Sequence, residues 1–201
     1  MKYPDTKKRI LKKAFEFFST NGYSGTSIRQ ISRSLGIRES AIYNHYKSKE
    51  EIFLSIIEQF KKESIGISIL SDDLLEELDN PEKFLKDFSK RLIDHWNKPE
   101  ERKFIRLLLM EQFTKTGSHV ISVSDYLTEL KSICKMIFNE MMKAGIIKHF
   151  DPELIVHEFI APLFLIRAEK LSSDDSTDIK EIYNLTNMHI DYFWNAIKLK
   201  K

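Results

Sequence analysis

The sequence predicts an all-α protein of about nine helices. Glycine and proline are scarce, at 6 and 5 residues in 201. Apolar residues recur at intervals of three and four along most of the chain, which is the period of a helix, and the alternation of period two that indicates strands is rare. Apolar residues make up 42% and charged residues 31% of the chain, a balance typical of a globular protein.

Composition also argues against several classes of protein. The longest apolar run, residues 159–166, is interrupted by Pro162 and is far shorter than the roughly 20 residues that a membrane helix needs. The first ten residues contain no apolar signal core. The single cysteine, Cys134, cannot form an internal disulfide and fits a reducing compartment. We therefore expect a cytoplasmic protein that does not enter a membrane.

Three helices are predicted within the first 50 residues. Their expected limits are residues 5–20, residues 27–35 and residues 38–46. Asn21-Gly22 ends the first helix, and Gly36 ends the second. Ser27 and Gln30 have the spacing of a capping box, in which each side chain bonds to the backbone of the other residue.

Six longer helices are predicted beyond this point. Ser48 and Glu51 form a second capping-box pattern, and Asn80 followed by Pro81 is a favoured helix start. The expected limits are residues 48–63, 80–96, 99–115, 122–143, 151–171 and 178–199. No internal repeat is visible, which argues against a helical solenoid.

Charge is unevenly distributed along the chain. The formal net charge is only +2, but residues 1–50 contain 11 Lys and Arg against 4 Asp and Glu, and the remainder of the chain is net acidic. A compact basic end fits either a nucleic-acid contact or a solvated basic surface.

The second and third helices, joined at Gly36-Ile37, form a helix-turn-helix pattern. Ile42 and Tyr46 are four residues apart and should pack inward. The same geometry turns Ser40, Ala41 and Asn44 outward. Asn44 suits an adenine edge, Ala41 a thymine methyl group and Ser40 several bases. Tyr43, His45, Lys47 and Lys49 are donors suited to phosphate, although on their own they could equally be solvated helix residues.

With its spacing intact, the segment from about residue 6 to residue 55 resembles the DNA-binding domain of the TetR family of bacterial transcriptional regulators. The resemblance is carried by Gly22-Tyr23, Thr26-Ser27-Ile28, Ile31, Leu35-Gly36-Ile37, Ile42-Tyr43, His45-Tyr46-Lys47 and Ser48-Lys49-Glu50-Glu51. It implies an all-helical homodimer with a DNA-binding domain at residues 1–48, a connecting helix at about 49–63, and effector binding and dimerisation within residues 49–201.

Carried over position by position, the resemblance assigns roles to nine residues. The base-reading residues would be Arg29, Ser40, Ala41 and Asn44. The phosphate-binding residues would be Thr26, Tyr43, His45 and Lys49, with Lys47 as an addition. Arg38 departs from the pattern, because it stands where Ser or Thr often caps the recognition helix, a change that costs about 1 kcal/mol of cap stability. Further departures are Ser32, Ser40 and Tyr46 in place of a common alanine, glycine and phenylalanine.

The C-terminal region carries no diagnostic motif. Its last two helices have broad apolar surfaces, which suit a four-helix dimer interface or the core of a monomer. The predicted interface residues are Ile155, Phe159, Leu163, Tyr183, Ile190, Phe193 and Trp194. The predicted effector-pocket residues, which favour an apolar or aromatic effector, are Trp96, Met110, Phe113, Tyr126, Met136, Asn139 and His157.

Signs of catalysis are missing from the sequence. It contains no phosphate-binding glycine loop and no HExxH pair, its six histidines are scattered, and Cys134 suits a buried core position. We therefore expect no enzyme activity, no cofactor and no metal. The predicted function is that of a repressor that a small-molecule effector releases from a palindromic operator. An all-helical enzyme or carrier, or a nucleoid-type protein that binds DNA of any sequence, are the alternatives.

Overall fold

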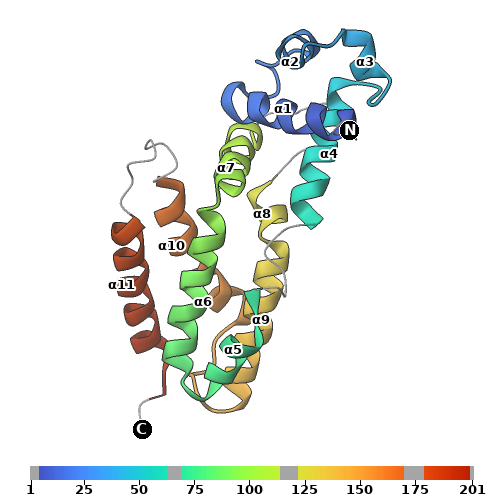
Figure 1. Cartoon of the computed structure of the whole chain (residues 1–201). Helices are drawn as coiled ribbons and strands as arrows, with labels where there is room; N and C mark the ends of the chain where they lie inside the picture. Colours follow the sequence, from blue (N-terminus) through green and yellow to red (C-terminus); the bar gives the residue numbers. More distant parts are fainter. Residues whose placement is uncertain (1–4, 63–68, 114–121, 170–178, 200–201) are drawn as a thin grey trace. The chain divides into compact units, whose positions relative to one another are not determined.

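A computed structural model describes residues 5–62, 69–113, 122–169 and 179–199 (Figure 1). Within these ranges the protein has eleven α-helices, one 3-10 helix and no strand beyond an isolated bridge between Ile147 and Lys198. The all-α prediction is confirmed. None of the helices in these ranges combines the length and the apolar character needed to cross a membrane.

The helices range in length from 4 residues in α5 and α8 to 19 residues in α11. Their bounds are α1 Thr6–Asn21, α2 Ile28–Leu35, α3 Glu39–Tyr43, α4 Lys49–Lys62, α5 Asp72–Leu75, the 3-10 helix Glu76–Asp79, α6 Pro81–Trp96, α7 Pro99–Glu111, α8 Val123–Tyr126, α9 Thr128–Lys143, α10 Pro152–Glu169 and α11 Ile179–Ile197.

The count exceeds the predicted nine for two reasons. The segment before α6, expected to be a loose link, forms α5 and the 3-10 helix, because Asp72 and Asp73 lie in the first turn of α5, where negative charge is favourable, and Leu74 is buried. The single helix predicted over residues 122–143 is divided into α8 and α9. The division falls at Leu127, which has φ −88° and ψ 0°.

The chain forms two compact units. The first comprises residues 1–64 and 102–126, and the second comprises residues 65–101 and 127–201, so that the division falls inside α7. A functional boundary at residue 48 remains a prediction.

An aromatic core holds the first unit together. Phe18 of α1 meets the edge of Phe53 of α4 with ring centroids 5.5 Å apart. Phe60 of α4 stacks on Phe104 of α7 at 4.2 Å. Burial of this much aromatic surface ties α1, α4 and the first-unit part of α7 into one support for α2 and α3.

The second unit is a helical bundle in which α10 packs against α6, α9 and α11, and α11 packs against α6. Phe159 of α10 is completely buried, and its ring lies 6.1 Å from that of Phe88, 5.3 Å from that of Phe138 and 5.4 Å from that of Phe193. One core residue of α10 therefore contacts α6, α9 and α11 together.

Candidate nucleic-acid interface

The capping box predicted at the start of α2 is present. The backbone N–H of Gln30 donates to Ser27 Oγ at 3.2 Å, and the backbone N–H of Ser27 donates to Gln30 Oε1 at 2.7 Å. At the other end of α2, Gly36 has φ 66° and ψ 30°, a left-handed conformation that glycine adopts without steric cost. Both ends of the supporting helix are thus fixed by local chemistry.

Helix α3 is held against this support by two side chains. Ile42 is completely buried and Tyr46 is 2% exposed, as their four-residue spacing predicts. The Tyr46 ring also lies under the ammonium group of Lys7, with Nζ 5.2 Å from the ring centroid. Burial raises the pKa of Tyr46 above its ordinary value.

Helix α3 ends earlier than predicted. It was expected to continue to about Tyr46, but its last residue is Tyr43 and Asn44 is the C-cap. The backbone N–H groups of His45 and Tyr46 both donate to the carbonyl of Ile42, at 2.9 and 3.0 Å, which tightens the last turn. The next helix, α4, begins at Lys49, and Oγ of the preceding residue, Ser48, accepts from the backbone N–H of Glu51 at 3.1 Å.

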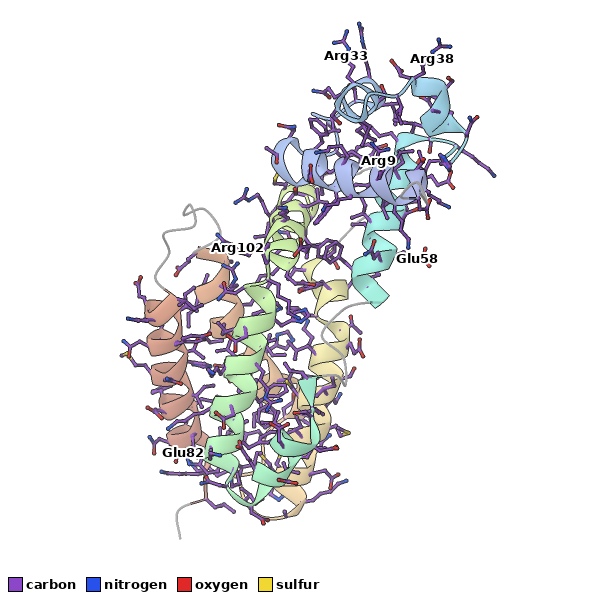
Figure 2. The ribbon with its side chains drawn as sticks, in the orientation of Figure 1. Arg9, Arg33, Arg38, Glu58, Glu82 and Arg102 are labelled. Carbon is purple, nitrogen blue, oxygen red and sulfur yellow. The ribbon has the colours of Figure 1, made fainter. Side chains whose placement is uncertain are left out.

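The outward face of this region is polar and exposed. Tyr43 is 51% exposed, Ala41 is partly exposed, and the other exposed members of the predicted set are Arg29, Ser40, Asn44, His45 and Lys47. Figure 2 shows Arg33 at the end of α2 and Arg38 at the start of α3 extending away from the ribbon on the same side of these helices. The structure thus gathers seven of the nine predicted DNA-contacting residues on accessible surface, and their contacts with DNA remain predictions.

The other two predicted residues, Thr26 and Lys49, make bonds inside the protein. Thr26 is 2% exposed, and its hydroxyl donates to the carbonyl of Gly22 at 2.9 Å. The Lys49 ammonium donates to the carbonyls of Tyr23 and Thr26, both at 2.8 Å, and lies 4.0 Å from the centroid of the Tyr23 ring. Burial lowers the pKa of Lys49, and the charge of Glu111 opposes that shift. A phosphate contact by either residue remains a prediction, and their structural contribution was not predicted.

One further residue contacts this turn, Glu111 of α7, which was not among the predicted DNA-contacting residues. Its side chain is 6% exposed, and Oε1 accepts a hydrogen bond from the backbone N–H of Tyr23 at 2.8 Å. The turn between α1 and α2 is therefore bonded to Lys49 through its carbonyls and to Glu111 through an N–H group. Because 88 residues separate Tyr23 from Glu111, no local pattern could have revealed the pair.

The predicted effector-pocket residues do not form one set in the structure. Met110, Phe113 and Tyr126 belong to the first unit, and the other four belong to the second. Trp96 is completely buried and Tyr126 is 7% exposed, whereas Phe113 is 88% exposed. Met110, Met136 and His157 are also exposed, and Asn139 is partly exposed. A pocket remains a prediction, and four of its seven residues lie at the surface of their own unit.

Most of the predicted dimer-interface residues are buried in the core of a single chain. Ile155, Phe159, Leu163, Ile190 and Phe193 are each at most 5% exposed, and Tyr183 and Trp194 are partly exposed. Side chains buried within one chain have little surface left for a partner. The large apolar side chains exposed on α10 and α11 are Leu154, Leu165, Ile179, Met188 and Tyr192.

Possible metal ligands and the single cysteine lie among the described residues. These contain no group of three or more His, Cys, Asp and Glu side chains placed to hold a metal ion. Cys134 is 1% exposed, and burial raises the pKa of its thiol, which keeps it from becoming a reactive thiolate.

Comparison with known proteins agrees with this geometry. Residues 10–56 match the family model described as bacterial regulatory proteins, tetR family. The chain is 33% identical over 82 residues to IcaR, the negative transcriptional regulator of the biofilm operon icaADBC in Staphylococcus epidermidis, a match that covers 41% of this chain and 44% of that protein. Residues 10–56 of this chain therefore resemble the N-terminal region of TetR-family regulators.

Two further proteins extend the likeness beyond the N-terminal region. The transcriptional repressor NicS of Pseudomonas putida is 27% identical over 157 residues, covering 77% of this chain and 71% of that protein. A solved structure of AibR in complex with isovaleryl coenzyme A and operator DNA superposes with a TM-score of 0.66 at 18% identity, covering 91% of this chain and 96% of that one. The chain spans less than half the length of IcaR, and the full-length agreement with AibR concerns the fold alone.

Proposed function

We propose that the protein is a dimeric transcriptional regulator of the TetR family, most simply a repressor, which binds a palindromic operator through α2 and α3. The observation that carries the proposal is the exposed polar surface of α3, with Ser40, Ala41, Tyr43 and Asn44 outside and Ile42 completely buried beneath them. A short helix fixed by one face, with hydrogen-bonding groups on the other, suits the major groove of DNA.

Two kinds of contact with DNA are expected from the residues on this surface. Asn44 and Ser40 would bond to base edges, which carry the sequence, and Tyr43, His45 and Lys47 would contact phosphates, which are the same in every sequence. The excess of basic residues in the first 50 positions supports attraction to DNA in general.

Selection from random-sequence DNA with the purified chain tests the proposal. The selected sites should be palindromic. Tyr43→Phe should weaken binding to all DNA and leave the preferred sequence unchanged, whereas Asn44→Ala should mainly relax the preference at one base pair of each half-site. Equal losses on every sequence from both variants would instead favour a nonspecific DNA-binding protein.

We propose that dimerisation uses the exposed side of α10 and α11, where Leu154, Leu165, Met188 and Tyr192 lie. A dimer would place two recognition helices on one duplex, as a palindromic operator requires. A small-molecule effector would then act by binding more tightly to the dimer geometry that does not fit the operator. AibR, which has been solved with both a small molecule and DNA, illustrates this combination within the same fold.

A further inference from the structure

Arg38 lies directly before α3, and its side chain does not stabilise the start of that helix. It is the N-cap residue, with the extended backbone that a cap requires, φ −76° and ψ 151°, but its side chain makes no capping hydrogen bond. Ser, Thr, Asp and Asn are the residues that stabilise this position. A cation is also unfavourable at the amino-terminal end of a helix, where the helix dipole is positive.

Within the described part of the chain, no contact of the Arg38 side chain offsets the cost of an arginine at this N-cap position. Arg38 is exposed, and its guanidinium forms no hydrogen bond, ion pair or ring contact with any residue in that part. Glu39 is the next residue on the same helix, and adjacent helical positions do not face each other. Residues that break a local rule without a compensating contact are candidates for function.

The position of Arg38 limits what that function can be. It precedes the first residue of α3, and the amino-terminal residues of a recognition helix are the ones that approach base edges in the major groove. The neighbouring residues Ser40 and Ala41 belong to the same accessible surface, and Figure 2 shows Arg38 extending away from the protein. Arginine pairs with guanine through two parallel hydrogen bonds, to O6 and N7, and this is the commonest specific contact in the major groove.

We propose that Arg38 is a specificity-determining residue that reads one guanine in each half of the operator. The inference rests on the proposed function and extends it by naming the base. Arg33 provides a contrast within the same motif. It lies in the last turn of α2, where a cation is favourable to the helix dipole, so its position has a structural reason and implies no base contact.

The test begins with operator selection by the full chain. The wild-type selection should return a palindrome with one strongly preferred G·C pair in each half-site. Arg38→Ala should lose roughly 5- to 150-fold in discrimination at that pair, and Arg38→Lys should lose less, because lysine keeps the charge and can reach the same atoms but lacks the planar fork of donors that matches O6 and N7. Arg33→Ala is the matched control, and any loss of affinity that it causes should be the same on every sequence.

A modified base identifies the atoms involved. Replacing the preferred guanine by 7-deazaguanine removes the N7 acceptor, so it should weaken binding of the wild type and leave binding of Arg38→Ala unchanged. Thermal unfolding in the absence of DNA separates recognition from folding. Arg38→Ser should unfold at the same temperature as the wild type or a few degrees higher, because serine can cap α3, and it should still lose the guanine preference.

Three results would overturn the inference. The first is a guanine preference that survives in Arg38→Ala, and the second is an equal loss on all sequences, which would indicate a phosphate contact. The third is a lower unfolding temperature in both Arg38→Ala and Arg38→Ser, which would indicate a structural role. A wild type that selects no sequence would overturn the proposed function, and this inference with it, so the two failures are distinguishable.

Discussion

Gly22 combines a positive φ with a crowded site for a Cβ atom, as no other described glycine does. Its φ is 73° and its ψ is 172°, a conformation that side-chain-bearing residues rarely adopt. A Cβ atom there would lie 3.0 Å from Oε1 of Glu111 and 3.3 Å from Cε of Met110. Glu111 is the residue that bonds to the next N–H group, so the small size of Gly22 is what permits the bond between α7 and the turn.

Gly22→Ala should therefore lower the free energy of unfolding by about 1–3 kcal/mol. Gly36→Ala is the comparison, because Gly36 has a left-handed helical backbone, φ 66° and ψ 30°, which other residues adopt at a cost of about 1–2 kcal/mol, and has nothing within 4 Å of its Cβ site. Chemical denaturation followed by circular dichroism should show a larger loss for Gly22→Ala. Equal losses would contradict the additional backbone strain and crowding expected at Gly22.

Lys49 contributes to stability in a way that can be separated from DNA binding. Lys49→Met keeps most of the side-chain packing but removes two hydrogen bonds from a charged donor, and we expect it to lower the free energy of unfolding by about 1–3 kcal/mol without DNA present. Lys47→Met is the control, since Lys47 is exposed, and it should change this free energy by less than about 0.5 kcal/mol. An unchanged free energy of unfolding in Lys49→Met would leave Lys49 with a DNA-contacting role alone.

At the residue scale, prediction from sequence succeeded where the reasons are local. The burial of Ile42 and Tyr46 follows from their spacing, and the Ser27–Gln30 capping box follows from a four-residue pattern. The bonds of Lys49 to carbonyls and of Glu111 to an N–H group depend on how α4 and α7 meet the turn, which only the folded chain determines.

At the scale of elements, the ends of helices were harder to predict than their existence. The early end of α3 at Tyr43 reflects two N–H groups that share one carbonyl, that of Ile42, and the division at Leu127 reflects one residue with non-helical backbone angles. Neither is marked by glycine or proline, the residues from which helix ends are usually inferred. The start of α6 was predictable because Asn80 and Pro81 are strong local signals, and Asn80 Oδ1 accepts from the backbone N–H of Lys83 at 3.3 Å.

The packing of α11 on α10 gives one titratable contact. His189 is partly buried, with Nε2 3.3 Å from the carbonyl oxygen of Phe159. Burial lowers the pKa of His189, while the Phe159 carbonyl and the charge of Glu158 oppose the shift. With a folded-state pKa below the unfolded value of about 6.5, the unfolded chain binds more protons as the pH falls, so this group's contribution to stability is intact above that pH and is lost below it.

Acidification should therefore destabilise the wild type more than a variant without this imidazole. We expect the unfolding temperature to fall further between pH 7.5 and pH 5.5 in the wild type than in His189→Gln, which removes the titrating group and keeps a hydrogen-bond donor. Scanning calorimetry at both pH values measures the difference. An equal fall in unfolding temperature in the two proteins would show that His189 makes no net contribution to the pH dependence of stability.

At the scale of the whole molecule, the last two helices, α10 and α11, were correctly predicted to be apolar. Most of the predicted dimer-interface residues on them, however, face inward. Phe159 and Phe193 fill the core, while Met188 is 60% and Tyr192 is 77% exposed. Helix α10 is apolar on nearly every side, so periodicity alone could not distinguish its core face from its accessible face. Burial in the folded chain makes that distinction.

The proposed dimer can be tested by introducing glutamate at an exposed methionine within the proposed interface and, separately, at an exposed methionine outside it. Met188→Glu places a charge among the exposed apolar side chains of α10 and α11, so it should convert the dimer to a monomer with unchanged helical content. Met136→Glu is the matched control, because Met136 is 52% exposed on α9, and it should leave the dimer intact. Sedimentation at micromolar concentration measures both. A wild type that is already monomeric, or a dimer that survives Met188→Glu, would contradict the proposed interface.

The five-residue length of α3 also bears on how the proposed regulator could diverge. The helix is too short to be stable alone and is held by Ile42 and Tyr46, while the positions that face outward, from Arg38 to Ala41, contribute little to folding. Under the proposed function, substitutions there would be nearly neutral for the fold and consequential for the operator. After gene duplication, one copy could therefore acquire a new set of target genes through a few such changes, without first passing through an unstable intermediate.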